Sequence, residues 1–317
     1  ELWRATGGLF HPRLASGASR PPAGRGGRAG RVSVTSPTTE ARQGFHPRLW
    51  ACFNAQEWPD KELIVVETFV HRPSAWLAKM AERDRRIVHA KFPVAAGADW
   101  SIGLKRNICA HLASGELIAH FDDDDVYAPS YLTKLVTYMQ GTTSMVLGVT
   151  LCSWFVYSLE EDRFFHCEPA ASERVEEDEQ QQWLALDQVK VSSFEGQPAQ
   201  VLRWTYGYGF SYVYRRRAVL DMPYEDMTFG EDFKFYEGLM REHGSLAILL
   251  LDDRDGICLH VQHGKNTSQT AHIAERTVPR EEALDLLFAD LFLSFSSPRL
   301  PAGPVPCRTA ASSAAAR

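Results

Sequence analysis

The sequence predicts an α/β protein whose mixed central sheet is flanked by helices. Short apolar runs alternate with helical patterns along the middle of the chain, which is the rhythm of βαβ units. One of these runs leads directly into four adjacent aspartates. With 317 residues, of which 44% are hydrophobic, the chain can bury a sizeable core. We therefore expect one large domain over residues 32–296, with an unfolded tail on each side.

The two tails are set apart by their composition. Residues 1–31 are rich in Gly, Arg, Pro, Ala and Ser, and Glu1 is their only acid. Such a segment lacks the apolar side chains needed for a packed core, so we expect it to be disordered. An Arg-rich segment poor in acids is also typical of an organelle transit peptide, which is the alternative interpretation. Residues 297–317, rich in Pro, Ala and Ser, are expected to be a second disordered tail.

The first elements of the domain follow in order. A strand is expected over Val32–Thr35, then a helix over Pro47–Asn54 and strands over Leu63–Val66 and Ile87–Phe92. The next helix begins after Ser101, whose hydroxyl suits an N-cap, and places Leu104, Ile108 and Leu112 on one face. Gly115 is expected to end it, because glycine commonly follows the last turn of a helix. A strand over Leu117–Phe121 comes next.

That strand runs directly into Asp122, Asp123, Asp124 and Asp125. A helix then begins near Pro129, and its buried face is expected to consist of Tyr131, Leu132, Leu135, Val136 and Met139. The acids therefore lie at the carboxyl end of a strand, where ligands bind in open α/β sheets. Adjacent carboxylates repel one another, so the run is either a solvated loop or a site for a hard cation. Its place between a buried strand and a helix favours the cation.

Mn²⁺ or Mg²⁺ is the expected cofactor. Both ions favour oxygen ligands and commonly use one or two carboxylates together with phosphate oxygens of a substrate. A nucleoside diphosphate would supply those oxygens. An EF-hand is excluded, because its loop needs alternating acids, a central glycine and a terminal glutamate, and this spacing is missing.

The second half of the domain gives weaker signals. Residues 145–165 have a strand-like pattern, and 172–190 form an acid-rich stretch that is expected to be a solvated loop or exposed helix. A strand is expected over Phe210–Tyr214. Gly230, Glu231 and Asp232 come just before a helix whose apolar positions are Phe233, Tyr236, Leu239 and Met240.

Charge and cysteine content exclude several classes of protein. The formal net charge is −6, and no Lys/Arg cluster is interleaved with aromatic residues, so nucleic acid is not an expected partner. The six cysteines are widely scattered, which indicates reduced, structural thiols rather than a disulfide scaffold. No apolar run reaches the roughly 20 residues needed to span a bilayer. A soluble, cytoplasmic protein is expected, and an anchor upstream of Glu1 stays open.

Five segments together carry a resemblance to a known family. They are Val32-Ser-Val-Thr-Ser-Pro-Thr, Lys61-Glu-Leu-Ile-Val-Val-Glu, Gly103-Leu-Lys-Arg-Asn, Ala113-Ser-Gly-Glu-Leu-Ile-Ala-His-Phe-Asp-Asp-Asp-Asp and Gly230-Glu-Asp. In this order they resemble glycosyltransferase family 2, with the GT-A fold, over about residues 32–268. The resemblance implies a metal-dependent, inverting transfer of a sugar from a nucleotide-sugar, UDP-linked, to an acceptor hydroxyl of a carbohydrate or another molecule. It also implies a donor-binding half over about 32–128 and an acceptor half over about 129–296.

The resemblance assigns the donor side of the site. It places Pro37, Thr38, Glu67, Arg106, Asp122 and Asp123 around the nucleotide-sugar, and Asp124 on the metal. A carboxylate at Glu67 could accept hydrogen bonds from a base or ribose, and an arginine at Arg106 could bind the diphosphate. The family more often has Asp-Asp where this chain has Glu67 and Thr68, which leaves the choice of base open. Asp125 is instead expected to cap the following helix.

The resemblance also assigns the chemistry and the acceptor side. It implies that Asp232 is the general base and that Glu231 supports it or binds the acceptor. His263 is the candidate imidazole ligand of the metal, whereas His260 is expected to be a packed, hydrogen-bonded histidine. Trp204 is a candidate for stacking on an acceptor sugar.

Two other functions are alternatives to sugar transfer. A sugar-nucleotide nucleotidyltransferase also needs a metal, but usually carries a Gly-rich loop with Arg and Lys after its first strand, where this chain has Thr35-Ser-Pro-Thr-Thr. A catalytically idle carbohydrate-binding or scaffold protein would need neither the aspartate run nor Asp232. The sequence does not identify the acceptor, because acceptors are recognised by loops that follow no general motif.

Overall fold

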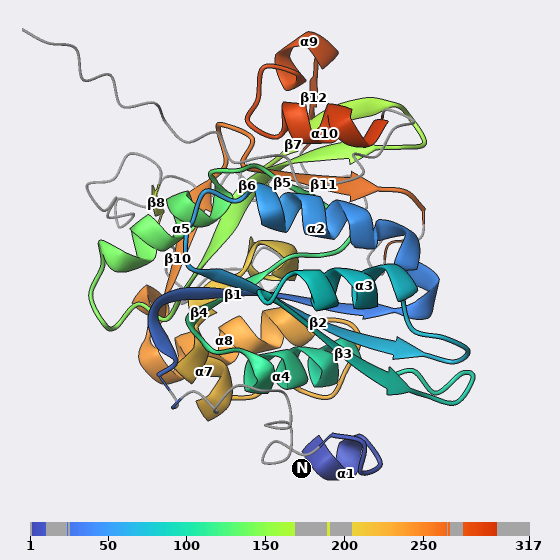
Figure 1. Ribbon diagram of the computed structural model, residues 1–317. Coiled ribbons are helices and arrows are strands. Elements are labelled where there is room, and N and C mark those ends of the chain that lie inside the picture. Colours follow the sequence, from blue (N-terminus) through green and yellow to red (C-terminus); the bar gives the residue numbers. More distant parts are fainter. Residues whose placement is uncertain are drawn as a thin grey trace, which may run out of the picture.

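The computed structural model describes residues 2–10, 24, 26–168, 189–190, 205–264, 266 and 275–296. In these residues, helices cover a mixed sheet on its two sides (Figure 1). The predicted α/β class is confirmed. The expected tail over 297–317, and residues 172–188 of the acid-rich stretch, lie outside the described residues.

The strands are β1 (Arg28–Thr39), β2 (Lys61–Phe69), β3 (Ile87–Pro93), β4 (Gly115–His120), β5 (Val126–Tyr127), β6 (Gly148–Ser158), β7 (Arg163–Cys167), β8 (Val189–Lys190), β9 (Val213–Arg215), β10 (Ile248–Asp252), β11 (Cys258–Gln262) and β12 (Glu275–Val278). The α-helices are α1 (Leu2–Ala5), α2 (His46–Ala55), α3 (Ala75–Arg83), α4 (Ile102–Leu112), α5 (Tyr131–Gln140), α7 (Arg216–Asp221), α8 (Glu231–His243), α9 (Arg280–Ala283) and α10 (Ala289–Ser296). Three 3₁₀ segments are η2 (Glu40–Phe45), η4 (Gly209–Ser211) and η5 (Ser245–Ala247).

The order of strands determines where the site forms. The path runs β3-β2-β1-β4-β9-β6-β7-β12. β3, β2, β1 and β4 are mutually parallel, so their carboxyl ends meet along one edge. The antiparallel β9 then joins β4 to β6. The carboxyl ends of β1 and β2, which hold Pro37, Thr38 and Glu67, are thereby brought beside the aspartates that follow β4.

Helix α4 follows its prediction at the start but not at the end. The Ser101 hydroxyl accepts the Leu104 N–H at 3.0 Å, so the predicted N-cap is confirmed. Gly115 does not end this helix, which stops at Leu112; it is the first residue of β4. A Cβ there would lie 2.6 Å from the Arg31 carbonyl oxygen. Glycine is therefore required by the close approach of β1, and not by a left-handed turn.

The strand expected over Phe210–Tyr214 is also shorter than predicted. Gly209–Ser211 form the 3₁₀ segment η4, and β9 begins only at Val213. The Ser211 hydroxyl accepts the Leu151 N–H of β6 at 3.1 Å, which is a ladder position that main chain would otherwise fill. A side-chain bond from η4 thus contacts β6 where the strand was expected.

The disorder expected over residues 1–31 is wrong for part of that segment. Helix α1 forms at Leu2–Ala5, and Phe10 is buried with its ring 6.1 Å from that of Phe92. β1 begins at Arg28 rather than at Val32. Phe10 joins the buried cluster that contains Phe92 and the α4 residue Ile108, and Leu2 packs against this cluster.

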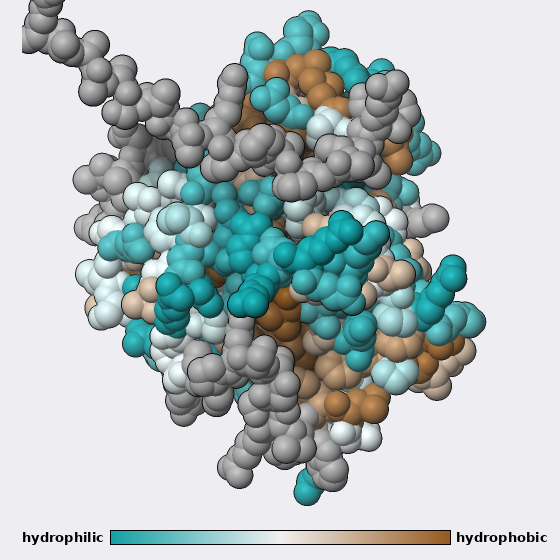
Figure 2. All heavy atoms as spheres, viewed as in Figure 1, coloured by the Kyte–Doolittle hydropathy of each residue, from teal (hydrophilic) through white to brown (hydrophobic). Residues whose placement is uncertain are grey.

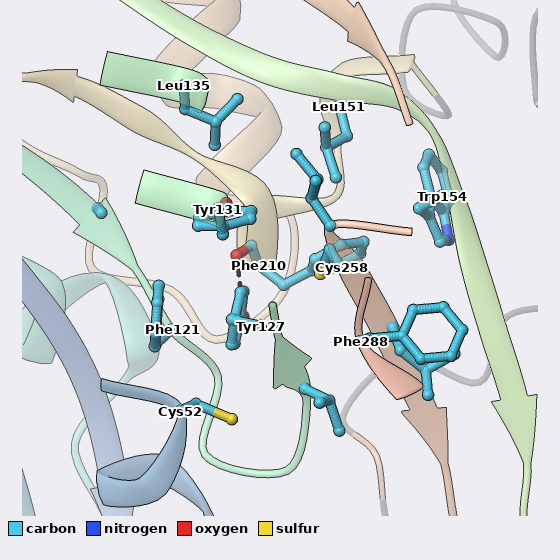
Figure 3. Close-up of a cluster of buried hydrophobic side chains, with 14 of the residues drawn as sticks. Cys52, Phe121, Tyr127, Tyr131, Leu135, Leu151, Trp154, Phe210, Cys258 and Phe288 are labelled. Atoms are coloured by element: carbon cyan, nitrogen blue, oxygen red, sulfur yellow. Dashed lines mark hydrogen bonds between the residues drawn. The ribbon is translucent and has the colours of Figure 1, made fainter. Parts of the chain in front are cut away.

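The core lies on both faces of the sheet. All five α5 residues predicted as buried are buried, and so are the five cysteines of the described residues. Figure 3 shows part of this core, where the rings of Phe121 and Tyr127 stack at 3.8 Å. The Tyr127 hydroxyl donates to the Phe210 main-chain oxygen at 3.0 Å. The core therefore ties the turn after β4 to η4.

In the part of the chain that the structure describes, none of the helices combines the length and apolar character that crossing a bilayer requires. Figure 2 shows hydrophilic residues gathered over α2 and α3, and apolar residues exposed near α10.

Candidate functional site

The four aspartates form a turn between β4 and β5. Asp123, Asp124 and Asp125 are buried, while the Asp122 side chain is about one-third exposed at 36%. Burial raises the pKa of Asp122, and the neighbouring carboxylates add to that effect. The Asp122 N–H donates to the Tyr127 hydroxyl at 2.9 Å, which fixes the start of the turn on the core. Buried carboxylates need partners, and each of the three has them.

Asp123 joins the end of β1. Its Oδ2 accepts the Thr38 hydroxyl at 2.6 Å, and its Oδ1 accepts the Arg42 Nε at 2.8 Å. Two residues assigned to the donor are therefore bonded to each other. Pro37, half-buried on β1, is the neighbour of Thr38.

The Asp124 carboxylate contacts three cationic or polar side chains. Its Oδ2 lies 2.8 Å from His263 Nε2, 2.6 Å from Arg42 Nη2 and 3.3 Å from Asn266 Nδ2. Although burial alone would raise it, the bonds from His263 and Arg42 hold the pKa of Asp124 well below its usual value. The structure thus brings together the two residues assigned to the metal.

Asp125 does not cap helix α5, contrary to the prediction. Its carboxylate accepts the Val261 N–H at 2.9 Å and lies 3.0 Å from His260 Nδ1, while Ser130 precedes α5 without a side-chain cap. Burial opposes a charge on His260, but Asp125 raises the pKa of this imidazole to about 9. His260 is a packed, hydrogen-bonded histidine, as expected. Asp125 instead fastens β11 to the aspartate turn.

The described residues contain one set of at least three acidic, histidine or cysteine side chains placed to share a metal ion. Oxygen atoms of Asp122, Asp124 and Asp125 all lie within 4.8 Å of one another. Carboxylates with a nearby imidazole, here His263, suit Mn²⁺ and Mg²⁺. The donor set therefore fits the expected cofactor, with Asp122 and Asp125 added to the residues assigned to it.

Arg106 links the aspartate turn to the predicted base. It is buried on α4, with Nε 3.2 Å from Glu231 Oε1 and Nη2 4.0 Å from Asp122 Oδ1. Its Nη1 lies 2.7 Å from Nδ1 of His120, a buried histidine whose pKa is lowered well below normal by burial and by Arg106. One buried guanidinium thus lies between Asp122 of the aspartate turn and Glu231 of α8.

Asp232 lies in the first turn of α8, after Gly230 in the left-handed conformation (φ 80°). Its Oδ2 accepts the Gly209 N–H at 2.9 Å. Burial raises the pKa of Asp232 to about 7, and Glu231 adds to this while Arg106 opposes it. A carboxylate with a pKa near neutrality can take a proton at physiological pH.

Glu67 is fully buried and already occupied by protein groups. Its oxygens accept the Ser74 N–H at 3.0 Å and the Gln43 amide at 2.8 Å, and His89 Nε2 lies 2.6 Å away. Burial opposes the charge, but His89, Ser74 and Gln43 hold the pKa of Glu67 below its usual value. The geometry favours a structural role in joining β2 to η2 and β3.

Replacing Glu67 by alanine is expected to lower the free energy of unfolding by about 3 kcal/mol, because His89 would lose its buried partner. Urea denaturation would measure the change. The pKa of Glu67 is lowered in the fold, so its contribution is present above the unfolded pKa and lost as pH falls through the folded pKa. Glu282→Ala, which breaks an exposed pair with Arg276, should cost at most about 0.5 kcal/mol. Equal losses in both variants would exclude this role.

Several contacts of the site have no counterpart in the sequence interpretation. Arg42, His120 and Asn266 were assigned no role, although Arg42 lies in η2, which directly follows β1. Asn266 begins an Asn-Thr-Ser triplet that matches a glycosylation acceptor. Its side chain instead accepts the His263 N–H at 2.8 Å and donates to Val261 O at 2.9 Å. Trp204, assigned to the acceptor, lies outside the described residues.

Comparison with known proteins adds independent evidence. The sequence matches the family model of Glycosyl transferase family 2 over residues 33–219. No curated protein sequence matches it. Among solved structures, S. aureus TarS 1–349 in complex with UDP-GlcNAc is 14% identical, with 77% of this chain and 62% of that chain covered and a TM-score of 0.50. The mannosyltransferase PcManGT from Pyrobaculum calidifontis, in complex with GDP-Man and Mn²⁺, is 14% identical over 84% of this chain and 64% of that chain, with a TM-score of 0.49.

The two kinds of likeness support different conclusions. This chain spans about three-fifths of the TarS fragment, and at 14% identity the likeness shows the fold, which is the GT-A fold that the resemblance implied. The family model reaches further, because residues 33–219 make up more than half of the 317 residues. The protein belongs to glycosyl transferase family 2.

Proposed function

We propose that the protein transfers a sugar from a nucleoside-diphosphate sugar to an acceptor hydroxyl, with Mn²⁺ or Mg²⁺ at the aspartate turn. The observation that carries this proposal is the placement of two carboxylate groups on either side of Arg106. Asp122 lies 4.0 Å from its guanidinium on the donor side, and Glu231 lies 3.2 Å from it on the side of Asp232. The donor and the acceptor could therefore bind on opposite sides of the buried Arg106 guanidinium.

Asp124 would hold the metal together with Asp122, Asp125 or His263. The ion, when bound, neutralises the charge that develops on the leaving diphosphate. Asp123 is tied to Thr38 and Arg42, so it keeps the turn and the end of β1 together beneath the donor. Arg106 faces the same negative charge from α4 and is the second cation available to the donor.

Asp232 is the proposed general base. As the acceptor oxygen forms its bond to C1 of the sugar, the bond from C1 to the diphosphate oxygen breaks, and the hydroxyl proton passes to Asp232. A single displacement of this kind inverts the configuration at C1. The Gly209 N–H bond and the first turn of α8 fix the orientation of the carboxylate, and Glu231 holds Arg106 beside it.

A panel of nucleotide-sugars incubated with Mn²⁺ and the purified chain tests this function, with UDP-GlcNAc as the first donor because TarS was crystallised with it. Release of free nucleoside diphosphate from one donor is the expected result. Release of pyrophosphate from a nucleoside triphosphate and a sugar phosphate would instead identify a nucleotidyltransferase. Donor binding without turnover with any acceptor would identify an idle binding protein.

Gly209→Ala is expected to reduce sugar transfer about 100-fold, because misplacing a catalytic group by about 1 Å has effects of that size. A Cβ at this position would lie 2.8 Å from Asp232 Cβ and 2.9 Å from its Oδ2, so the base must move. Donor affinity, measured by calorimetry, should stay within about twofold of the wild-type value. The control Gly44→Ala meets open space and should keep full activity. An unchanged rate of sugar transfer in Gly209→Ala would show that Gly209 does not position Asp232.

A further inference from the structure

Arg42 occupies an unusual place, since its guanidinium lies between two carboxylates of the aspartate turn. Its Nε is 2.8 Å from Asp123 Oδ1 and its Nη2 is 2.6 Å from Asp124 Oδ2. The exposed fraction of its side chain is 22%, whereas Asp123 and Asp124 are almost fully buried. One cation thus serves two buried anions at the position where the metal is expected.

Aromatic contacts connect Arg42 to the other partner of Asp124. The Arg42 guanidinium carbon lies 5.2 Å from the centroid of the Phe45 ring, within the range of a cation–π contact. On the same ring, His263 stacks with a centroid distance of 5.0 Å. Arg42 and His263 therefore approach Asp124 as neighbours that share one support.

A divalent ion and Arg42 would compete for Asp124. The carboxylates that could share an ion include Asp124, and Arg42 already bonds to Asp124 Oδ2. A guanidinium and a divalent cation on the same carboxylate repel each other strongly, because little water separates them at a buried site. Arg42 can stay on Asp123 when it leaves Asp124, since Nε and Nη2 both bond to Asp123 Oδ1.

We propose that Arg42 is the resident counter-ion of Asp123 and Asp124, and that a divalent ion takes its place at Asp124, so that Arg42 sets the metal affinity of the site. This inference rests on the metal requirement of the proposed function. In the metal-free protein, Arg42 neutralises the buried acids and keeps the turn folded. When the divalent ion binds, Arg42 keeps its hydrogen bonds to Asp123 and stays at the edge of the donor site.

Titration of the protein with Mn²⁺ alone, followed by the electron paramagnetic resonance signal of free Mn²⁺, tests the competition without any turnover. Arg42→Gln is expected to bind Mn²⁺ about tenfold more tightly than the wild type, a coupling of ordinary size. Arg48→Gln is the matched control. Arg48 donates to the main-chain oxygen of Asp124 at 2.8 Å, so its loss removes a nearby charge but frees no carboxylate. Its Mn²⁺ affinity should change less than about threefold.

Thermal unfolding gives a second readout. Without metal, Arg42→Gln should melt at a lower temperature than the wild type, because Asp123 and Asp124 lose their counter-ion, and saturating Mn²⁺ should raise its melting temperature more than that of the wild type. If Arg42→Gln does not fold, Arg42→Lys serves instead. An ammonium group cannot bond both carboxylates in the forked geometry, so tighter Mn²⁺ binding is again expected.

The outcomes separate this inference from the proposed function. Equal or weaker Mn²⁺ binding by Arg42→Gln, with the wild type binding Mn²⁺, would overturn the role of Arg42 and leave the metal requirement standing. Absence of Mn²⁺ binding in both proteins would overturn the metal requirement and the inference with it.

Discussion

Asp124→Ala is expected to abolish metal-dependent donor binding and to lower sugar transfer by roughly 1,000-fold, since a Lewis-acid metal contributes several kcal/mol to stabilising the leaving group. The carboxylate of Asp124 is the point at which His263, Arg42 and Asn266 converge. Its removal takes away a ligand that the neighbouring acids cannot replace. Calorimetric titration of UDP-GlcNAc with and without Mn²⁺ would measure the loss.

A surface aspartate provides the comparison. Asp255 pairs with Lys134, its side chain is 45% exposed, and it is not among the carboxylates that could share a metal ion. Asp255→Ala should therefore retain the Mn²⁺ dependence of the wild type, and circular dichroism should show both variants folded. An Asp124→Ala protein that still bound donor more tightly with Mn²⁺ than without would remove Asp124 from the metal site.

Asp232→Asn is expected to keep donor binding and to lower transfer by about 100- to 10,000-fold, the range typical of losing a general base. The asparagine oxygen can still accept the Gly209 N–H, so geometry is preserved while proton uptake is lost. The wild-type pH profile of kcat/KM should rise with pH and level off above about 7. The base acts only when ionised, and burial raises the pKa of Asp232 to about 7.

Glu237→Gln supplies the matched change on the same helix, because Glu237 pairs with the exposed Arg241 one turn away. It should leave both the rate and the pH profile unchanged. Either full transfer activity in Asp232→Asn or a flat wild-type profile between about pH 5.5 and 8.5 would rule out Asp232 as the base.

The sequence predicted those parts of the fold that depend on nearby residues. The Ser101 cap depends on a residue three positions away, and the buried face of α5 depends on a helical period. The position of the aspartates at the end of β4 follows from the apolar run before them. Each of these features is caused by residues close together in the sequence, so it can be recognised without knowledge of the tertiary structure.

Other features of the site depend on residues far apart in the chain. Arg42 meets Asp123 across 81 positions, and Asp125 meets Val261 across 136. Nothing local distinguishes an aspartate that caps the next helix from one that binds a distant strand, so the role predicted for Asp125 was wrong. The amide of Asn266 reaches Asp124 across 142 positions, and no local pattern around Asn266 indicates this contact.

Strand β6 is hydrogen-bonded to β10 along its first part and to β11 along its last part. It also pairs with β9, which in turn pairs with β4. The β4–β9 pair therefore joins strands from before residue 128 to strands from after it. A polypeptide cut near residue 128 and expressed as two pieces would expose unpaired strand edges on both, and these edges are prone to aggregation. The expected halves, 32–128 and 129–296, are therefore joined in one continuous sheet through the β4–β9 pair.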